Sequence, residues 1–380
     1  MRVAIISESF PPDINGVAHS VVRVAEHLLT RGHQPLVVAP EPASGTARVA
    51  GRLPYPVVRV PSVPMPGYPS FRLGLPSRRI AEALVGHGTD VVHLASPFFL
   101  GARGSAVAQR LRLPHVAVYQ TDIPAYAAAY RMRGIGGAAA WRWLRAIHNG
   151  ADRTLAPSTA SATALHEHGV ERVWLWRRGV DTVRFHPRHR SAAVRRALAP
   201  HGEVLVGYVG RLATEKRVDL LAPIGTLPGV RLVIIGGGPA EAALRRELPG
   251  AVFLGPRQGN QLARLYASLD VFVHSGPYET FGQTVQEAAA SGLPVVAPAA
   301  GGPLDLVLDG ISGYLVPPLS APALADAVAT LAGRADLRRA FGAAGRSMVL
   351  GRSWAAVGDQ LVDHYSAVLG GVRAPAVAAA

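Results

Sequence analysis

Short apolar runs alternate with amphipathic segments along the first half of the chain. Strands are expected at residues 3–7, 36–39, 57–60, 91–94 and 115–119. Helices are expected near 17–31, near 77–86, between the last two of these strands as far as residue 111, and near 124–148. Strands without a polar face are typical of parallel sheets that helices cover on both sides. This half is therefore predicted to be a doubly wound α/β domain.

The same alternation starts again near residue 204. Strands are expected at residues 204–209, 231–235, 252–254, 271–274 and 294–297, each followed by a helix or a turn. A polar, arginine-rich stretch at 177–202 separates the halves and is interpreted as an interdomain linker. Open parallel sheets bind ligands at the carboxyl ends of their strands, so two such halves predict a cleft between those ends.

Composition supports two cores and limits the possible chemistry. The chain has 380 residues, of which 49% are hydrophobic, and single cores usually stop growing before this length. Without cysteine there is no disulfide, thiolate metal ligand or thiol nucleophile, which suits a reducing compartment. Glu8 interrupts the short apolar N-terminal run, so no signal peptide is expected, and no apolar stretch reaches the ~20 residues that span a bilayer. A cytoplasmic location is the resulting expectation.

The net charge of +14 indicates an anionic partner. A phosphate-rich substrate, nucleic acid and an acidic membrane surface all fit this charge, and composition does not choose among them. The arginines are spread along the chain, so part of the charge is also explained as solvated surface.

Lys216 is the one lysine of the chain, because every other Lys or Arg position holds arginine. It lies with Arg211 in the loop that leaves the expected strand at 204–209. Lysine carries a compact point charge that suits a phosphate oxygen, whereas arginine offers a planar fork. The pair predicts a diphosphate clamp, with an ordinary surface loop as the alternative.

A second informative segment, at 276–294, follows an apolar strand and opens a helix that ends at Gly292. Glu279 precedes this helix and Glu287 lies within it. Backbone N–H groups in the first turn of a helix have no partner inside the helix and can bind an anion. The residues expected to offer these groups are Gly282, Gln283 and Thr284.

In combination, these segments resemble the family-4 retaining glycosyltransferases of the GT-B fold, whose signature pairs Gly-Arg-x4-Lys with Glu-x7-Glu. The resemblance covers essentially the whole chain, including residues 8–12, 15–17, 179–181 and 301–303. It implies that Arg211 and Lys216 hold the donor diphosphate. It also implies that Glu279 orients the hydroxyls of the donor sugar and that Glu287 binds the ribose. Gly210 and Phe281 complete the expected donor-binding set in this half.

Three residues of the first half join the expected site. Gly16 lies in a strand-to-helix loop, where glycine lets backbone approach a ligand, and in the family this glycine faces the diphosphate; plain turn chemistry is the alternative. Gln120 stands where many family members have a histidine near the reacting sugar. Asp122 can accept bonds from sugar hydroxyls, align an acceptor or cap the helix that follows. The expected catalytic residues are Arg211, Lys216, Glu279, Asp122 and Gln120.

The Gln120-Thr121-Asp122 segment and the segment at 91–97 look most like the branch that uses GDP-mannose to mannosylate glycolipids and phosphatidylinositol mannosides. The resemblance thus implies an α-mannosyltransferase with a lipid-linked acceptor, peripheral on the inner face of the plasma membrane. Arg72, Arg78 and Arg79 are candidates for contacting an anionic bilayer. A transferase that uses a UDP- or ADP-sugar on a soluble acceptor is the first alternative. A basic nucleic-acid-binding protein is the second, although no basic motif interleaved with aromatic residues is present.

The expected domains are an acceptor-binding domain at 1–180 and a nucleotide-sugar-binding domain at 181–352. A helix at 353–370 is expected to pack back on the first domain, and 371–380 to be a disordered tail. No Asp-x-Asp pair or Cys/His cluster is placed to hold a metal, so neither metal nor cofactor is expected. Residues 236–239 are interpreted as a tight turn rather than a phosphate loop, and His93 as a core histidine.

Overall fold

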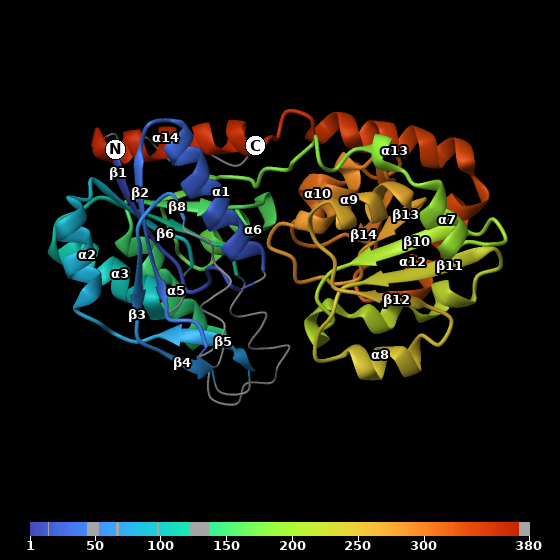
Figure 1. Ribbon diagram of the computed structural model, residues 1–380, viewed down its shortest axis with the longest axis horizontal. Helices are drawn as coiled ribbons and strands as arrows, with labels where there is room; N and C mark the ends of the chain where they lie inside the picture. Colours follow the sequence, from blue (N-terminus) through green and yellow to red (C-terminus); the bar gives the residue numbers. More distant parts are fainter. Residues whose placement is uncertain (14, 44–52, 66–67, 97–98, 122–136, 372–380) are drawn as a thin grey trace. The chain divides into compact units, whose positions relative to one another are not determined.

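The computed structural model describes residues 1–13, 15–43, 53–65, 68–96, 99–121 and 137–371 (Figure 1). These residues form two compact units, each built on one large parallel sheet. The first unit contains the described residues up to 178 and those from 354 onward, and the second contains residues 179–353. The predicted fold class, two doubly wound α/β units, is confirmed.

The sheet of the first unit has the strand order β3-β2-β1-β6-β7-β8-β9. Its strands are β1 (Arg2–Ile6), β2 (Gln34–Pro40), β3 (Val57–Val60), β6 (Val91–Leu94), β7 (His115–Val118), β8 (Arg153–Ala156) and β9 (Val173–Leu175). An antiparallel hairpin of β4 (Ser62–Met65) and β5 (Tyr68–Gly74) follows β3. The helices are α1 (Gly16–Thr30), α2 (Arg79–His87), α3 (Phe99–Arg110), α5 (Gly137–Gly150), α6 (Thr159–Glu167) and α14 (Trp354–Leu369).

The sheet of the second unit has the order β12-β11-β10-β13-β14-β15. Its strands are β10 (Val204–Val209), β11 (Val230–Ile235), β12 (Val252–Gly255), β13 (Val271–Val273), β14 (Val295–Pro298) and β15 (Gly313–Val316). Its α-helices are α7 (Ala192–Leu198), α8 (Glu241–Glu247), α9 (Gly259–Ser268), α10 (Gln283–Ala290), α11 (Pro303–Leu306), α12 (Ala321–Gly333) and α13 (Ala335–Val349). Short 3-10 helices lie at Pro187–His189, Thr214–Lys216 and Val218–Thr226.

Both sheets reverse their winding direction beside the first strand of the unit. In the first unit β1 lies between β2 and β6, and in the second β10 lies between β11 and β13. The chain therefore leaves the carboxyl ends of β1 and β6, or of β10 and β13, in opposite directions. Such a switch point leaves a crevice in which open α/β sheets bind ligands.

Buried aliphatic side chains cover both faces of each sheet. Ile5 and Val37 belong to one core of the first unit, whereas Ile6 and Val38 belong to the other. Alternate residues of a strand point to opposite faces, so a strand buried on both faces has no polar alternation. This packing explains the continuous apolar runs of the sequence.

The arginine-rich stretch at 177–202 is part of the second unit from residue 179 onward rather than a free linker. Val180 and Phe185 are buried in a core of that unit, and α7 packs against α9. Arg190 and Arg195 both bind the Asp270 carboxylate, at 2.7 and 2.8 Å. The interpretation as a linker was wrong. Two apolar residues of the stretch are buried in the core of the second unit, and two of its arginines bind an acid elsewhere in that unit.

Helix α14 packs in the first unit, alongside α1 (Figure 1). The indole N–H of Trp176 donates a hydrogen bond to the Val357 carbonyl at 2.9 Å, and the Tyr365 hydroxyl lies 2.6 Å from Nδ1 of His93. His93, Trp176 and Tyr365 are almost fully buried. The interpretation of His93 as a core histidine is confirmed by this contact.

Candidate functional site

Lys216 and Glu279 form an ion pair at the switch point of the second unit. Lys216 lies in the loop after β10, and Glu279 lies in the loop after β13, the neighbouring strand. The Lys216 Nζ contacts Oε1 of Glu279, and both side chains are less than one-fifth exposed. Two residues far apart in the sequence are thus brought together at the carboxyl ends of neighbouring strands.

Arg211 is paired with a carboxylate of its own loop. Its Nη2 contacts Oε1 of Glu215, whose side chain is only 1% exposed, whereas the Arg211 side chain is 31% exposed. A buried acid thus holds a guanidinium that still reaches the surface. Burial and pairing orient this cation, because an arginine without a partner would sample many rotamers.

Glycines allow the loops of this site to pack against one another. Gly236 has a φ of 149°, and a Cβ at this position would lie 1.8 Å from the Gly210 carbonyl oxygen. Gly238 has a φ of 158°, and its Cβ would lie 2.3 Å from the Leu212 carbonyl oxygen. A side chain at either position would displace the loop that carries Arg211. The turn at 236–239 therefore supports the loop that carries Arg211 through direct backbone contact.

The loop that carries Glu279 is held by backbone contacts with residues 301–302. The N–H of Gly302 donates a hydrogen bond to the Glu279 carbonyl at 2.7 Å. A Cβ on Gly301 would lie 2.3 Å from this carbonyl oxygen, and one on Gly302 would lie 1.9 Å from the Phe281 carbonyl oxygen. The Phe281 side chain is buried in a core of the unit, so only its backbone can face a ligand.

Helix α10 begins shortly after Glu279. Its N-cap residue is Gly282, whose φ is 94°. The side chain of Gln283 donates to the Gly179 carbonyl at 3.1 Å, and the Thr284 carbonyl accepts a hydrogen bond from the Tyr266 hydroxyl at 3.2 Å. The N–H groups of the first turn of α10 have no acceptor within the helix. This helix end therefore offers donors beside the Lys216 and Glu279 loops.

Glu287 lies in α10 and is almost fully buried. Burial raises the pKa of its carboxyl from the ordinary 4.5 to about 7. Hydrogen bonds from Gln283 and Tyr266 and the charge of Arg184 oppose this rise. Folding thus holds an acid where its charge is unfavourable, and such groups are concentrated at functional sites.

A separate group of polar residues lies in the first unit. Nε2 of Gln120 donates to the Ala95 carbonyl at 2.9 Å, and its Oε1 accepts from Nη2 of Arg178. Nη1 of Arg178 donates to the Gly16 carbonyl at 3.2 Å, and a Cβ on Gly16 would lie 2.8 Å from this nitrogen. Gly16 and Gln120 are therefore brought together by Arg178. The predicted Asp122 lies outside the described residues.

Sequence reasoning missed Arg178 and His274. Arg178 is 8% exposed and directly precedes the Gly179-Val180-Asp181 segment, whereas His274 is 2% exposed and ends the run of β13. Nε2 of His274 lies 3.7 Å from Oε1 of Glu279. Neither position has a spacing that marks it, and the only signal was that each borders a segment already considered informative.

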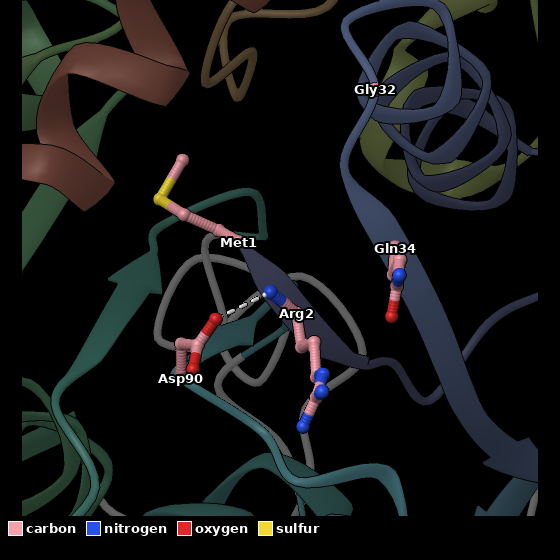
Figure 2. A pocket seen from close by; sticks show the side chains of 5 residues that line it. All are labelled: Met1, Arg2, Gly32, Gln34 and Asp90. Atoms are coloured by element: carbon pink, nitrogen blue, oxygen red, sulfur yellow. Dashed lines mark hydrogen bonds between the residues drawn. The ribbon is translucent and has the colours of Figure 1, made fainter.

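A small polar pocket lies at the opposite end of the first sheet. Its lining residues are Met1, Arg2, Gly32, Gln34 and Asp90. The backbone N–H of Arg2 donates to the Asp90 carboxylate at 2.7 Å (Figure 2). Arg2 and Gln34 start their strands, so the pocket lies away from the carboxyl ends where a substrate site is expected.

In the part of the chain that the structure describes, no group of three or more His, Asp or Glu residues is arranged to hold a metal ion. Within the same residues, no helix has the length and apolar character needed to cross a bilayer.

Two family models match the chain. One described as Glycosyltransferase Family 4 matches residues 14–184, and one described as Glycosyl transferases group 1 matches residues 190–348. The first match lies mostly in the first structural unit and the second within the other unit.

Two relatives are similar over nearly the full chain, and both are named GDP-mannose-dependent alpha-mannosyltransferase. The one from Mycobacterium tuberculosis is 50% identical, with 97% of each chain covered. The one from Mycolicibacterium smegmatis is 48% identical, with 97% of this chain and 98% of the relative covered. The solved structure of a sucrose-phosphate synthase from Thermosynechococcus elongatus shares the fold, with a TM-score of 0.81 and 22% identity, and the similarity covers 98% of this chain and 100% of that one.

The raised pKa of Glu287 predicts a dependence of stability on pH. Between pH 4.5 and about 7 the unfolded chain releases this proton while the folded protein retains it, so rising pH favours unfolding across this window. Glu287→Gln removes the titration. We expect its melting temperature, measured against wild type by calorimetry, to rise progressively across the window and to level off above it.

Glu247→Gln is the matched control, because Glu247 is an exposed glutamate on α8 of the same unit. If both variants differ from wild type by an amount that is independent of pH, Glu287 does not retain its proton in the folded protein.

Proposed function

The chain belongs to glycosyltransferase family 4, and on this premise we propose that it transfers mannose from GDP-mannose to a lipid-linked acceptor with retention of the anomeric configuration. The family and the GT-B fold expected from the motifs are confirmed by the family models and by the full-length structural similarity. The observation that carries the choice of donor is the similarity of 48–50% to two enzymes named for GDP-mannose.

The diphosphate of the donor would bind between the loop that carries Arg211 and Lys216, here called the clamp loop, and the start of α10. Lys216 and Arg211 supply positive charge, and the first-turn N–H groups at 282–284 supply hydrogen-bond donors. Diphosphate anions are favoured where a helix N-terminus and fixed cations converge. This arrangement supports binding of the leaving group rather than activation of a protein nucleophile.

The two carboxylates have separate roles in this proposal. Glu279, beside Lys216, accepts hydrogen bonds from the mannose hydroxyls, whereas Glu287, farther along α10, accepts them from the ribose. The raised pKa of Glu287 fits this role, because two ribose hydroxyls would donate hydrogen bonds to a carboxylate that burial keeps from water, and these bonds would favour its charged form.

In the reaction, the bond between C1 of mannose and the β-phosphate oxygen breaks as the acceptor hydroxyl forms a new C1–O bond on the same face. The acceptor proton passes to the departing diphosphate. Negative charge develops on that diphosphate, so Arg211, Lys216 and the helix amides lower the barrier by stabilising it. This differs from retaining glycosidases, in which two carboxylates about 5 Å apart act on opposite faces of the sugar.

A lipid-linked acceptor is supported by an exposed aromatic and basic surface on α3 and α5, which pack against each other (Figure 1). The rings of Phe99 and Trp143 lie 6.0 Å apart and are 54% and 45% exposed. Arg142 and Arg145 are exposed on the same helix as Trp143. Aromatic side chains insert at a bilayer interface while nearby arginines bind anionic headgroups.

The arginines first expected at the membrane are a weaker choice. Arg72 donates to the Ser62 and Glu41 carbonyls within its own hairpin region, and Arg79 pairs with the Glu41 carboxylate at 3.2 Å. Arg78 alone of the three is exposed without a described partner. The surface on α3 and α5 is therefore the proposed contact with the membrane.

The clamp predicts large losses of turnover. We expect Lys216→Ala and Arg211→Ala each to lower kcat by roughly 10²–10³-fold, because each removes a preorganised charge from the leaving group. Since both act on one diphosphate, the double variant should be little worse than the worse single variant. The check is steady-state kinetics, with Arg246→Ala on the exposed face of α8 as the control. Full turnover by a folded Lys216→Ala protein would contradict the clamp.

The donor and acceptor are tested together. GDP should raise the melting temperature more than UDP or ADP does, and Glu287→Ala should reduce this shift. Incubation with GDP-mannose and a lipid extract should then yield a mannosylated lipid detected by mass spectrometry. If UDP or ADP stabilises the protein and GDP does not, the donor is not GDP-mannose. If the mannosylated product is confined to the aqueous fraction, the acceptor is not a lipid.

Binding to the membrane is tested by vesicle sedimentation. Wild-type protein should bind anionic vesicles, bind neutral ones weakly and dissociate in high salt. Replacing Arg142 and Arg145 with Ala should cost about 2 kcal/mol, roughly 30-fold in affinity, at about 1 kcal/mol per arginine. Arg245→Ala with Arg246→Ala, two arginines on α8, is the matched control. Equal binding to neutral vesicles would contradict an electrostatic contact.

A further inference from the structure

His274 is a buried imidazole that no predicted role uses. It follows β13 directly, is 2% exposed and lies parallel to the Tyr208 ring, with an interplanar angle of 9° and centroids 6.5 Å apart. Among the described residues, neither ring nitrogen forms a hydrogen bond of normal geometry. A buried polar group without a partner is costly, and each case in a native protein requires an explanation.

Glu279 is the acid closest to this ring. Nε2 of His274 lies 3.7 Å from Oε1 of Glu279, which is too long for a hydrogen bond. Lys216 contacts the same oxygen. The lysine and the imidazole therefore face one carboxylate oxygen, and the lysine lies closer to it.

The surroundings of the imidazole favour its neutral form. Burial lowers the pKa of His274 and the charge of Lys216 lowers it further, while Glu279 and the Gly276 backbone oppose the change. The phenol of Tyr208 is the remaining titratable group against the ring. A neutral imidazole has one N–H to donate, and a carboxylate is the best acceptor within reach.

We propose that His274 is a positioning residue that holds Glu279 when the donor diphosphate takes Lys216. The inference rests on the proposed function only in that a diphosphate is the anion that reaches this lysine. Lys216 has three N–H donors but a single positive charge, so a bound diphosphate shares that charge and weakens the pair with Glu279. A shift of about 0.5 Å then brings Glu279 into hydrogen-bond range of Nε2.

The exchange explains why neither ring nitrogen forms a hydrogen bond of normal geometry here. Glu279 must keep its place beside two phosphates that repel it, and it must do so in the geometry that the sugar hydroxyls require. A carboxylate held by one N–H donor retains its acceptor capacity for those hydroxyls. His274 thus acts on the reaction through Glu279 and does not touch the substrate.

The test compares two variants with wild type. His274→Phe retains a ring against Tyr208 but has no N–H donor, whereas His274→Gln retains a donor. We expect His274→Phe to lower kcat about tenfold and to leave the dissociation constant of GDP, measured by calorimetry, within twofold of wild type. His274→Gln should recover part of the loss.

Double variants separate positioning from packing. If His274 acts through Glu279, adding His274→Phe to Glu279→Gln should cost little further activity. A full additional loss, or a loss of GDP affinity as large as the loss of turnover, would overturn the inference. So would equal activities of the Phe and Gln variants, because a core role depends on shape and not on the donor.

A spectroscopic readout needs no His274 variant. The ring N–H proton of His274 should shift downfield in NMR spectra when GDP binds wild type, and should not shift when GDP binds Glu279→Gln.

If GDP binds without this shift, the inference fails and the proposed function stands. If UDP or ADP binds and GDP does not, the proposal of GDP-mannose as donor is wrong. The shift of the ring proton is then measured with the nucleotide that binds. If pyrophosphate and all three nucleotides leave both the heat signal and the ring proton unchanged, both proposals are overturned.

Discussion

The ion pair between Lys216 and Glu279 joins the loops after two neighbouring strands, β10 and β13. Both loops leave the sheet at its switch point, where the chain departs from the strand ends in opposite directions. The backbone of each loop packs against a glycine that has no room for a side chain: Gly238 lies against the Leu212 carbonyl and Gly301 against the Glu279 carbonyl. The placement of the candidate site therefore depends on close backbone packing, and the charges are held in place by it.

Charge is balanced within the site before any substrate is considered. Lys216 is paired with Glu279, and Arg211 with the buried Glu215. Two cations confined without partners would repel each other, and two lone buried acids would take up protons. A diphosphate that enters must therefore exchange partners with these pairs, and this exchange is the basis of the role inferred for His274. The surface on α3 and α5 that is proposed to contact the membrane differs from this site, because its arginines are exposed.

The sequence determined the architecture to a large extent. The apolar runs predicted most strands of both sheets, and 204–209 coincides with β10, because a strand buried on both faces must be apolar throughout. The motifs also predicted the family, since the Arg211, Lys216, Glu279 and Glu287 spacings are specific in combination. The strands β8, β9 and β15 were not predicted, because β9 has three residues and β8 and β15 begin with Arg153 and Gly313, which leaves each apolar run too short to mark a strand.

Only the tertiary structure decided which side chains meet. The structure pairs Lys216 with Glu279 across 63 positions and Gln120 with Arg178 across 58, and no local pattern encodes such distances. Burial decided the rest: it placed Phe281 in the core, raised the pKa of Glu287 and left His274 beside Glu279. Residue types and spacings specify the elements and the available chemistry. The contacts between loops arise from the packing of whole sheets, so they emerge only when the chain is folded.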